Sequence, residues 1–204
     1  LKINGIDVTI VNRTDSLNIV NDIADKKSSV DGGFIGSDAP EADGGHLRQV
    51  GTVMLAPVYL IVQRDSNLGE IVNLQGRSVS LYPVGSPPWY ACTNIFGAYG
   101  LSFAEEKILY GNSSSIIQDV TNGKSEAGCF VDASPGIRDD ISSIADDLTN
   151  ENLRFLSIPQ SQAMQVHQKF LSPTVIPSGT FKIFPPLPDT DIATIALSVT
   201  FVAK

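Results

Sequence analysis

Residues 61–86 constrain the fold of this chain most, because they contain two apolar runs separated by a polar turn, a short helical stretch and a glycine. The second run, residues 78–82, ends in the loop Pro-Val-Gly-Ser, and Pro87 then opens a helix. A strand that ends in a Gly/Ser loop and leads into a helix N-terminus points several backbone N–H groups at one spot. Such a spot suits a carboxylate or a phosphate.

Strand-like and helix-like segments alternate along the rest of the chain. The expected strands cover residues 1–11, 33–35, 50–62, 78–82, 108–110, 127–131, 153–158 and 192–202, and the expected helices cover 17–27, 68–74, 87–99, 113–121, 135–148 and 160–171. This alternation predicts an α/β fold with mostly parallel sheets flanked by helices. Residues 50–62 are interrupted by Pro57, and we expect one or two strands there that cross toward a second lobe.

The composition excludes several classes of partner. The chain has 204 residues, 42% of them hydrophobic, which is enough for one large domain or two small lobes. Its formal charge of −8 argues against a nucleic acid partner and against docking on anionic membranes. No apolar run approaches the roughly 20 residues of a membrane-spanning helix. The chain starts at Leu1 without a signal peptide, so we expect a mature or excised fragment.

Motifs for catalysis, cofactors and metals are missing from the sequence. It contains no nucleophile elbow, no phosphate-binding Gly-Lys-Ser/Thr loop and no dinucleotide fingerprint, so we expect no enzyme activity and no cofactor. The two histidines, His46 and His167, and the two cysteines, Cys92 and Cys129, do not have the spacing of a metal site. The cysteines are either a disulfide of an exported protein or two small buried hydrophobes, and the sequence leaves both open.

The loop and helix that follow the strand over residues 78–82 supply the first candidate ligand-binding residues. The backbone of Gly85 and Ser86, with the Ser86 hydroxyl, can bind a carboxylate, or can form an ordinary capped turn. Two prolines follow and remove two N–H donors, which favours a less charged ligand. Trp89 and Tyr90 lie in the first turn of the helix, where they can stack on a ligand or pack at the edge of a lobe.

Other candidates follow other predicted strands. Thr14, Asp15 and Ser16 lie between a strand and a helix; Asp15 can pair with an ammonium group, and the alternative for all three is helix capping. Ser37 and Asp38 end a buried strand, where open α/β sheets place ligands; the alternative for Asp38 is a turn cap.

The loop after residues 127–131 adds Asp132 and Ser134, the latter as a hydrogen-bond donor or as the cap of the next helix. The carboxyl ends of strands converge on the crevice of a two-lobed α/β fold, so we expect these candidates to meet there.

Several short motifs together resemble the TAXI family of solute receptors for TRAP transporters. These are the order of elements in residues 61–86, Ala-Tyr-Gly-Leu at 98–101, the helix, glycine and small-residue strand of 120–131, Ile-Pro-Ser-Gly-Thr-Phe at 176–181 ahead of the apolar run 192–202, and Asp-Gly-Gly-Phe-Ile-Gly-Ser-Asp at 31–38. In the last motif Gly36 stands where the family usually has Gln.

The resemblance implies a two-lobed fold of the type 2 periplasmic-binding-protein class. Residues 1–60 plus 172–204 would form lobe 1, and residues 61–171 would form lobe 2, inserted between them. Full-length members of the family begin one strand earlier, so we expect truncation at both ends or a shortened member.

The resemblance also implies an extracytoplasmic solute-binding protein that captures a small polar ligand, of the amino acid or carboxylate type, for a membrane transporter. We therefore expect a periplasmic or other extracytoplasmic location. The alternative is the ligand-sensing domain of a receptor with its own membrane anchor. An enzyme on the same fold is a third alternative, which the missing catalytic motifs disfavour.

Overall fold

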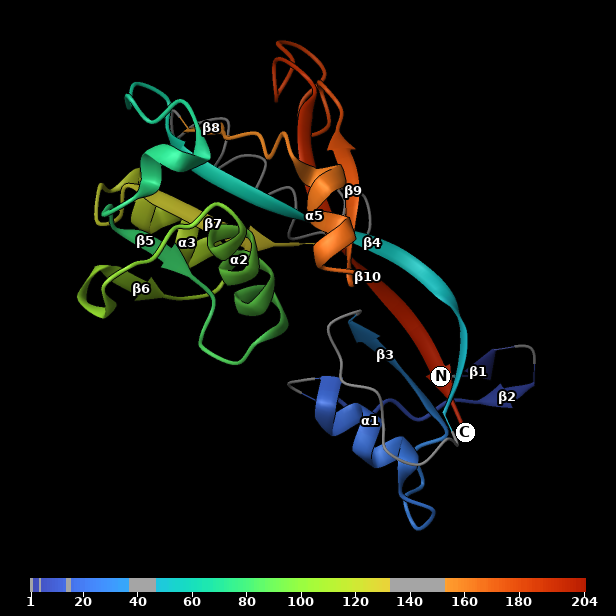
Figure 1. The fold of residues 1–204 in the computed structure, drawn as a ribbon. Helices are drawn as coiled ribbons and strands as arrows, with labels where there is room; N and C mark the ends of the chain where they lie inside the picture. The colour runs from blue at the N-terminus through green and yellow to red at the C-terminus, as the bar shows by residue number, and fades with distance from the viewer. Residues whose placement is uncertain (1, 4, 14–15, 37–46, 133–152) are drawn as a thin grey trace.

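The computed structural model describes residues 2–3, 5–13, 16–36, 47–132 and 153–204 (Figure 1). Its helices and 3-10 turns are α1 (Ser16–Ala24), η1 (Ile71–Leu74), α2 (Pro87–Ala98), η2 (Glu105–Lys107), α3 (Ser113–Thr121) and α5 (Ser161–His167). Its strands are β1 (Lys2–Ile3), β2 (Ile6–Asp7), β3 (Gly32–Gly36), β4 (Arg48–Gln63), β5 (Val79–Leu81), β6 (Ile108–Tyr110), β7 (Ala127–Val131), β8 (Leu153–Phe155), β9 (Leu171–Ile176) and β10 (Ile192–Ala203). The helix expected over 135–148 lies outside the described residues, as do the candidates Thr14, Asp15, Ser37, Asp38 and Ser134.

Most of these strands form one eight-stranded mixed sheet with the order β3-β10-β4-β7-β5-β6, in which β8 also pairs with β4 and β9 with β10. In the described part of the chain the parallel pairs are β5 with β6 and β5 with β7, and every pair that involves β4 or β10 is antiparallel. The α/β fold with flanking helices is confirmed, but the prediction of mostly parallel sheets is wrong. The two longest strands, β4 and β10, lie side by side in opposite directions. Most strand pairs of the described sheet include one of these two strands, so most pairs are antiparallel.

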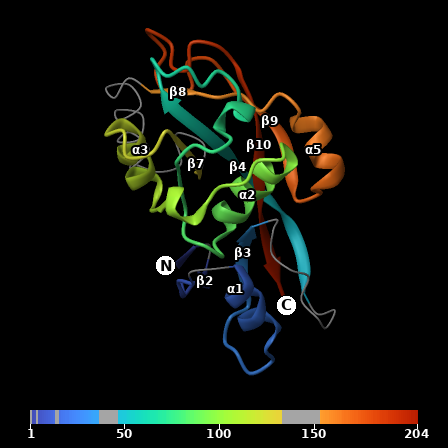
Figure 2. The same ribbon diagram turned by 60° about the vertical axis from the view of Figure 1, so that its left-hand side comes forward.

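The two long strands, β4 and β10, extend through the whole molecule (Figure 1). β4 has 16 residues and is continuous through Pro57, which lies opposite Ala196 of β10. The helices α2 and α3 gather with β5, β6 and β7 at one end of β4, whereas α1, β3 and the β1–β2 pair lie at the other end (Figures 1 and 2). Both ends of the chain lie near α1.

Alternate residues of β7 face two hydrophobic cores, one on each side of the sheet. Cys129 and Val131 belong to the core under α2, and Phe130 belongs to the core under α3. Gly128 permits the close approach of α3, because a Cβ atom at this position would lie 2.6 Å from Cγ2 of Ile116. The helices α2 and α3 therefore pack on opposite faces of β7 and of the adjacent half of β4.

The helices begin and end at local signals. Ser86 caps α2 and is followed by two prolines in the first turn, as predicted. The cap of α3 is Asn112, whose side chain accepts from the Ser115 N–H at 2.9 Å. Asparagine is among the residue types that cap a helix N-terminus best. No helix in the described part of the chain is both long and apolar enough to cross a membrane.

Two segments differ from the expected elements. Residues 8–13 form no regular structure, although their alternation predicted a strand over 8–11. The last helix ends at His167, four residues before the predicted end at Leu171, and Leu171 instead begins β9, which the sequence analysis missed. β9 forms an antiparallel pair with β10, in which Leu171 lies opposite Leu197. Only this long-range pairing distinguishes an extended segment from the end of a helix.

Candidate ligand-binding site

The carboxyl ends of three neighbouring strands, β6, β5 and β7, lie at one edge of the sheet. Tyr82 directly follows β5, Ser113 opens α3 three residues after the end of β6, and Asp132 directly follows β7. This edge is where open α/β sheets bind ligands, because loops and helix N-termini converge there. The three residues therefore occupy the position at which a site is expected.

A chain of hydrogen bonds joins these three side chains. The Ser113 hydroxyl donates to Oδ2 of Asp132 at 3.0 Å, and it lies 2.5 Å from the hydroxyl of Tyr82. Either hydroxyl can be the donor in the second bond, and the Tyr82 hydroxyl also donates to the Val131 carbonyl at 3.5 Å. The backbone N–H of Asp132 donates to the Pro57 carbonyl at 3.3 Å, which ties the loop to β4. The chain holds a carboxylate and two hydroxyls in fixed positions.

The Asp132 carboxylate also affects the pKa of a tyrosine, Tyr59, in the core beneath it. Burial raises the pKa of the Tyr59 hydroxyl well above its usual range, and the negative charge of Asp132 raises it further. Tyr59 stacks on Phe130 with the ring centroids 5.1 Å apart. The charge of Asp132 therefore acts on a buried side chain of the core.

The first turn of α2 is poorly suited to an anion. Pro87 and Pro88 have no N–H, and the Trp89 N–H donates to Oγ of Ser86 at 3.4 Å. The Ser86 N–H donates to the Pro83 carbonyl at 3.2 Å, and the Ser86 hydroxyl donates to the same carbonyl at 2.7 Å. The N–H groups of Ser86 and Trp89 and the Ser86 hydroxyl are therefore already used inside the turn.

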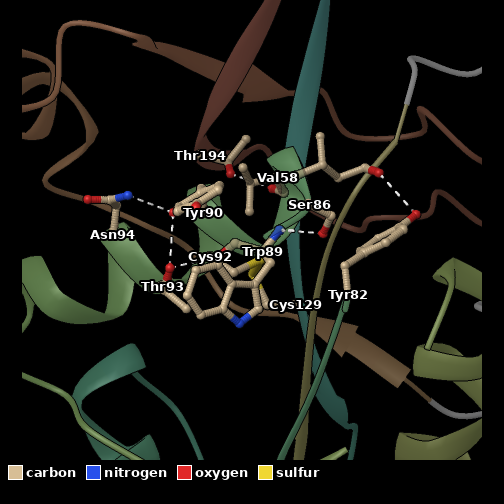
Figure 3. Close-up of a disulfide and its surroundings, with 11 residues drawn as sticks. Val58, Tyr82, Ser86, Trp89, Tyr90, Cys92, Thr93, Asn94, Cys129 and Thr194 are labelled. Atoms are coloured by element: carbon tan, nitrogen blue, oxygen red, sulfur yellow. Dashed lines mark hydrogen bonds between the residues drawn. A yellow bond between two sulfur atoms is a disulfide. The ribbon is translucent and has the colours of Figure 1, made fainter. Parts of the chain in front are cut away.

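The remaining candidates of this loop lie on the α2 side of the sheet (Figure 3). Gly85 is exposed and has φ +85°, a left-handed conformation that favours glycine. Trp89 is half-buried and packs against the core, while Tyr90 is 45% exposed. Their rings meet edge to face with centroids 5.0 Å apart. The pair forms an aromatic surface at the start of α2.

A disulfide joins Cys92 of α2 to Cys129 of β7 (Figure 3). Of the two alternatives that the sequence left open, the structure has the bridge, and both residues are buried. Cys92 lies in the second turn of α2, and Cys129 lies three residues before Asp132. The bridge therefore fixes the α2 turn relative to the strand end that carries Asp132.

The structure thus connects one predicted site residue, Asp132, with two that the sequence analysis did not name, Ser113 and Tyr82. The signal for Ser113 was present, because it opens a helix after a strand in the same way as the residues that follow β5. Ser16 is the first residue of α1, at the opposite end of β4. Among the described residues, no group of three or more His, Cys, Asp or Glu side chains could hold a metal ion.

Comparisons with known proteins agree on the fold. The sequence profile of the NMT1-like family matches residues 18–204. The periplasmic aliphatic sulphonate-binding protein SsuA of Escherichia coli superposes with a TM-score of 0.54 at 16% identity, over 94% of this chain and 52% of that protein. The periplasmic sulfonate-binding protein SsuA of Methylobacillus flagellatus gives 0.52 at 16% identity, over 91% of this chain and 44% of that one.

A third structure with this fold is the CcmR regulatory domain of Synechocystis in complex with 2-PG, with a TM-score of 0.51 at 16% identity, over 93% of this chain and 70% of that one. At this identity the three likenesses establish the fold alone, which is that of the periplasmic solute-binding proteins. The chain spans about half the length of the two sulfonate-binding proteins, 44% and 52%.

Proposed function

This chain belongs to the NMT1-like family, and from that membership we propose that it is an extracytoplasmic solute-binding protein that captures a small polar organic ligand without turning it over. The observation that carries the proposal is the hydrogen-bonded chain of Tyr82, Ser113 and Asp132 at the carboxyl edge of the sheet. Hydroxyls and a carboxylate held at such an edge can orient a polar ligand through hydrogen bonds.

Of the two ligand types that we expected, an amino acid fits better than a simple carboxylate. The Asp132 carboxylate, which accepts from the Ser113 hydroxyl, can pair with the ammonium group of an amino acid. At the first turn of α2, the N–H groups of Ser86 and Trp89 and the Ser86 hydroxyl already donate to Pro83 and Ser86, so they are not available to an anion. We therefore propose a ligand that carries an amine, such as an amino acid.

We further propose that the ligand lies between two lobes, residues 1–60 plus 172–204 and residues 61–171. In this arrangement Gly85, Ser86, Trp89 and Tyr90 border the site from lobe 2, beside the Asp132 loop and Ser134. The lobe 1 side would contribute the candidates that follow its strands, namely Thr14, Asp15, Ser16, Ser37 and Asp38. Closure of the lobes on the ligand would signal occupancy.

The membrane partner that we propose is a transporter, of the TRAP type if the TAXI resemblance holds. A regulatory role is the second candidate, because a regulatory domain shares the fold. A neighbouring gene for a TRAP membrane subunit would favour transport, and a signalling module in the same polypeptide would favour regulation.

A thermal-shift screen of amino acids, dicarboxylates and other small organic acids tests the binding function. A ligand at about 100 times its dissociation constant stabilises the folded protein by about 2.7 kcal/mol. We expect at least one amine-bearing compound to stabilise the protein, and Asp132→Asn to weaken its binding about ten-fold or more by calorimetry, since hydrogen bonds to charged groups contribute about 1.5–3 kcal/mol.

The matched control is Asp65→Asn, which removes an exposed carboxylate from the turn after β4 and should leave the affinity unchanged. If no compound of the screen stabilises the protein, or if Asp132→Asn binds as tightly as the wild type, the proposed site is wrong.

A further inference from the structure

A separate groove of about 330 Å³ lies between α2 and the edge strand β6. Its walls are mainly apolar, and they include Trp89 and Phe96 from α2, Phe103 from the following loop, and Ile108 and Tyr110 from β6. The volume falls at the lower end of the range of small-molecule pockets, about 300–1,000 Å³. The groove is therefore large enough for one aromatic ring with a short substituent.

The groove exists because α2 sits over β5 and β7 and not over β6. The disulfide and the core side chains Ala91, Cys92 and Ile95 hold one flank of the helix against the middle of the sheet. The other flank carries Trp89 and Phe96, two turns apart, and faces β6, beyond which the described sheet has no further strand. The space beside this flank is left to solvent.

This groove is on the opposite side of the sheet from the Asp132 chain. Leu81 and Tyr110 are register partners in β5 and β6, and both line the groove. Asp132, in contrast, bonds to Ser113 at the start of α3, which covers the other face. The two sites therefore lie on different faces of the sheet, and of the described residues that we propose for the solute site only Trp89 also lines the groove.

One charged side chain lines the groove, and it is an acid. The Glu105 carboxylate accepts a hydrogen bond from the Tyr110 hydroxyl at 3.1 Å, and none of the ion pairs in the described part of the chain includes Glu105. Lys107, two residues further along the chain, donates from its ammonium to the Gly76 carbonyl at 2.5 Å and forms no ion pair with Glu105. The groove thus combines aromatic walls with a carboxylate that lies outside the ion pairs of the described residues.

We propose that this groove is a second binding site, for a small organic cation with an aromatic or apolar body, such as an arylalkylamine. The ammonium group would pair with Glu105 and lie against the ring of Trp89 or Tyr110, whose faces attract cations. The apolar body would cover Phe96, Phe103 and Ile108, which removes apolar area from water. The proposal is independent of the ligand bound at Asp132.

The sequence provides a direct reporter, because Trp89 is the single tryptophan of the chain. Its fluorescence is measured while phenethylamine is added, with 2-phenylethanol as the uncharged analogue and propylamine as the amine without a ring. We expect a saturable change with phenethylamine and at least five-fold weaker binding of each analogue, because one loses the ion pair and the other loses the ring.

Two neighbouring acids make a matched pair of variants. Glu105→Gln should weaken phenethylamine binding about five-fold and abolish its preference over 2-phenylethanol. Glu106→Gln removes the same charge one residue away, from a side chain that does not line the groove, and should change the affinity less than two-fold. Both residues are exposed, so both variants should fold, which circular dichroism checks.

The proposal is overturned if phenethylamine causes no saturable change, if Glu105→Gln binds as the wild type does, or if Glu106→Gln weakens binding equally. Asp132→Asn separates this site from the proposed solute site. It should leave phenethylamine binding at Trp89 unchanged, whereas a loss there would mean that a single site serves both ligands.

Discussion

The two halves of β4 belong to one continuous strand and have very different surroundings. Residues 56–62 are all buried, whereas residues 48–55 are exposed or half-buried. The buried half pairs with β7, β8 and β10 and is covered by α2 and α3. The exposed half pairs with β10 along one edge in the described part of the chain, and Val50 and Val53 are 67% and 52% exposed.

The difference shows that a residue of β4 can belong to a strand without being buried in a core. The apolar, β-branched residues of β4 favour a strand along its whole length. Burial depends on what packs above and below. At the end of the sheet that holds the exposed half, α1 packs on β3, where Ile19 lies close to Gly33. On the other face of that end, Phe34 and Phe201 contact each other at 5.1 Å, with Phe34 58% exposed. Most of the stability therefore resides at the α2–α3 end.

Removal of the disulfide should give the largest loss of stability, and the loss should be confined to the buried half of β4. The bridge closes a sequence separation of 37 residues, and by the chain-entropy relation its loss destabilises the folded state by about 4 kcal/mol. The double variant Cys92→Ala, Cys129→Ala should show this loss in urea unfolding. Amide hydrogen exchange should accelerate at residues 58–62 and stay the same at 48–55. Equal acceleration in both halves would mean that they unfold as one unit.

Truncation of one apolar side chain in each half should give the next largest difference in the free energy of unfolding. Leu60 is 2% exposed, so Leu60→Ala should cost about 3 kcal/mol through lost burial and a cavity. Val53 is 52% exposed, and Val53→Ala should change the free energy of unfolding by less than about 0.5 kcal/mol. Comparable losses for the two variants, measured by denaturant unfolding, would show that the exposed half is covered in solution.

Glycine substitutions should produce the smallest effects, with opposite signs. In Gly128→Ala the new methyl group would meet Ile116 at 2.6 Å, and we expect a loss of about 2 kcal/mol from overpacking. In Gly51→Ala the methyl group has open space within 4 Å, and we expect a gain of about 0.5 kcal/mol from the reduced entropy of the unfolded chain. A loss for Gly51→Ala would contradict the open environment of this half.

Local signals explain which elements of the fold were predictable. The strands Ile108–Tyr110 and Ala127–Val131 and the helix Ser113–Thr121 have the predicted bounds. Gly100 and Gly123, which follow the ends of α2 and α3, have φ +70° and +68°, the left-handed conformation in which glycine commonly ends a helix. Caps, prolines, glycine stops and apolar periodicity act over a few residues, so a single sequence contains the information.

The candidate site was predictable only in part for the same reason. Asp132 could be named because it follows a buried strand. Its connection to Tyr82 through Ser113 joins residues that are far apart along the chain. The sequence also suggested the Ser86 turn as an anion site, while the hydrogen bonds that consume its donors appear only in the folded loop.

The sequence by itself thus determined most of the described helices and strands, the capped α2 with its prolines, and the resemblance to solute-binding proteins. The tertiary structure alone decided that β9 pairs with β10, that the sheet is mixed, and that Cys92 meets Cys129. It also decided which half of β4 is buried. Each of these outcomes depends on partners far away in the chain, and an apolar residue has the same propensity whether or not a partner covers it.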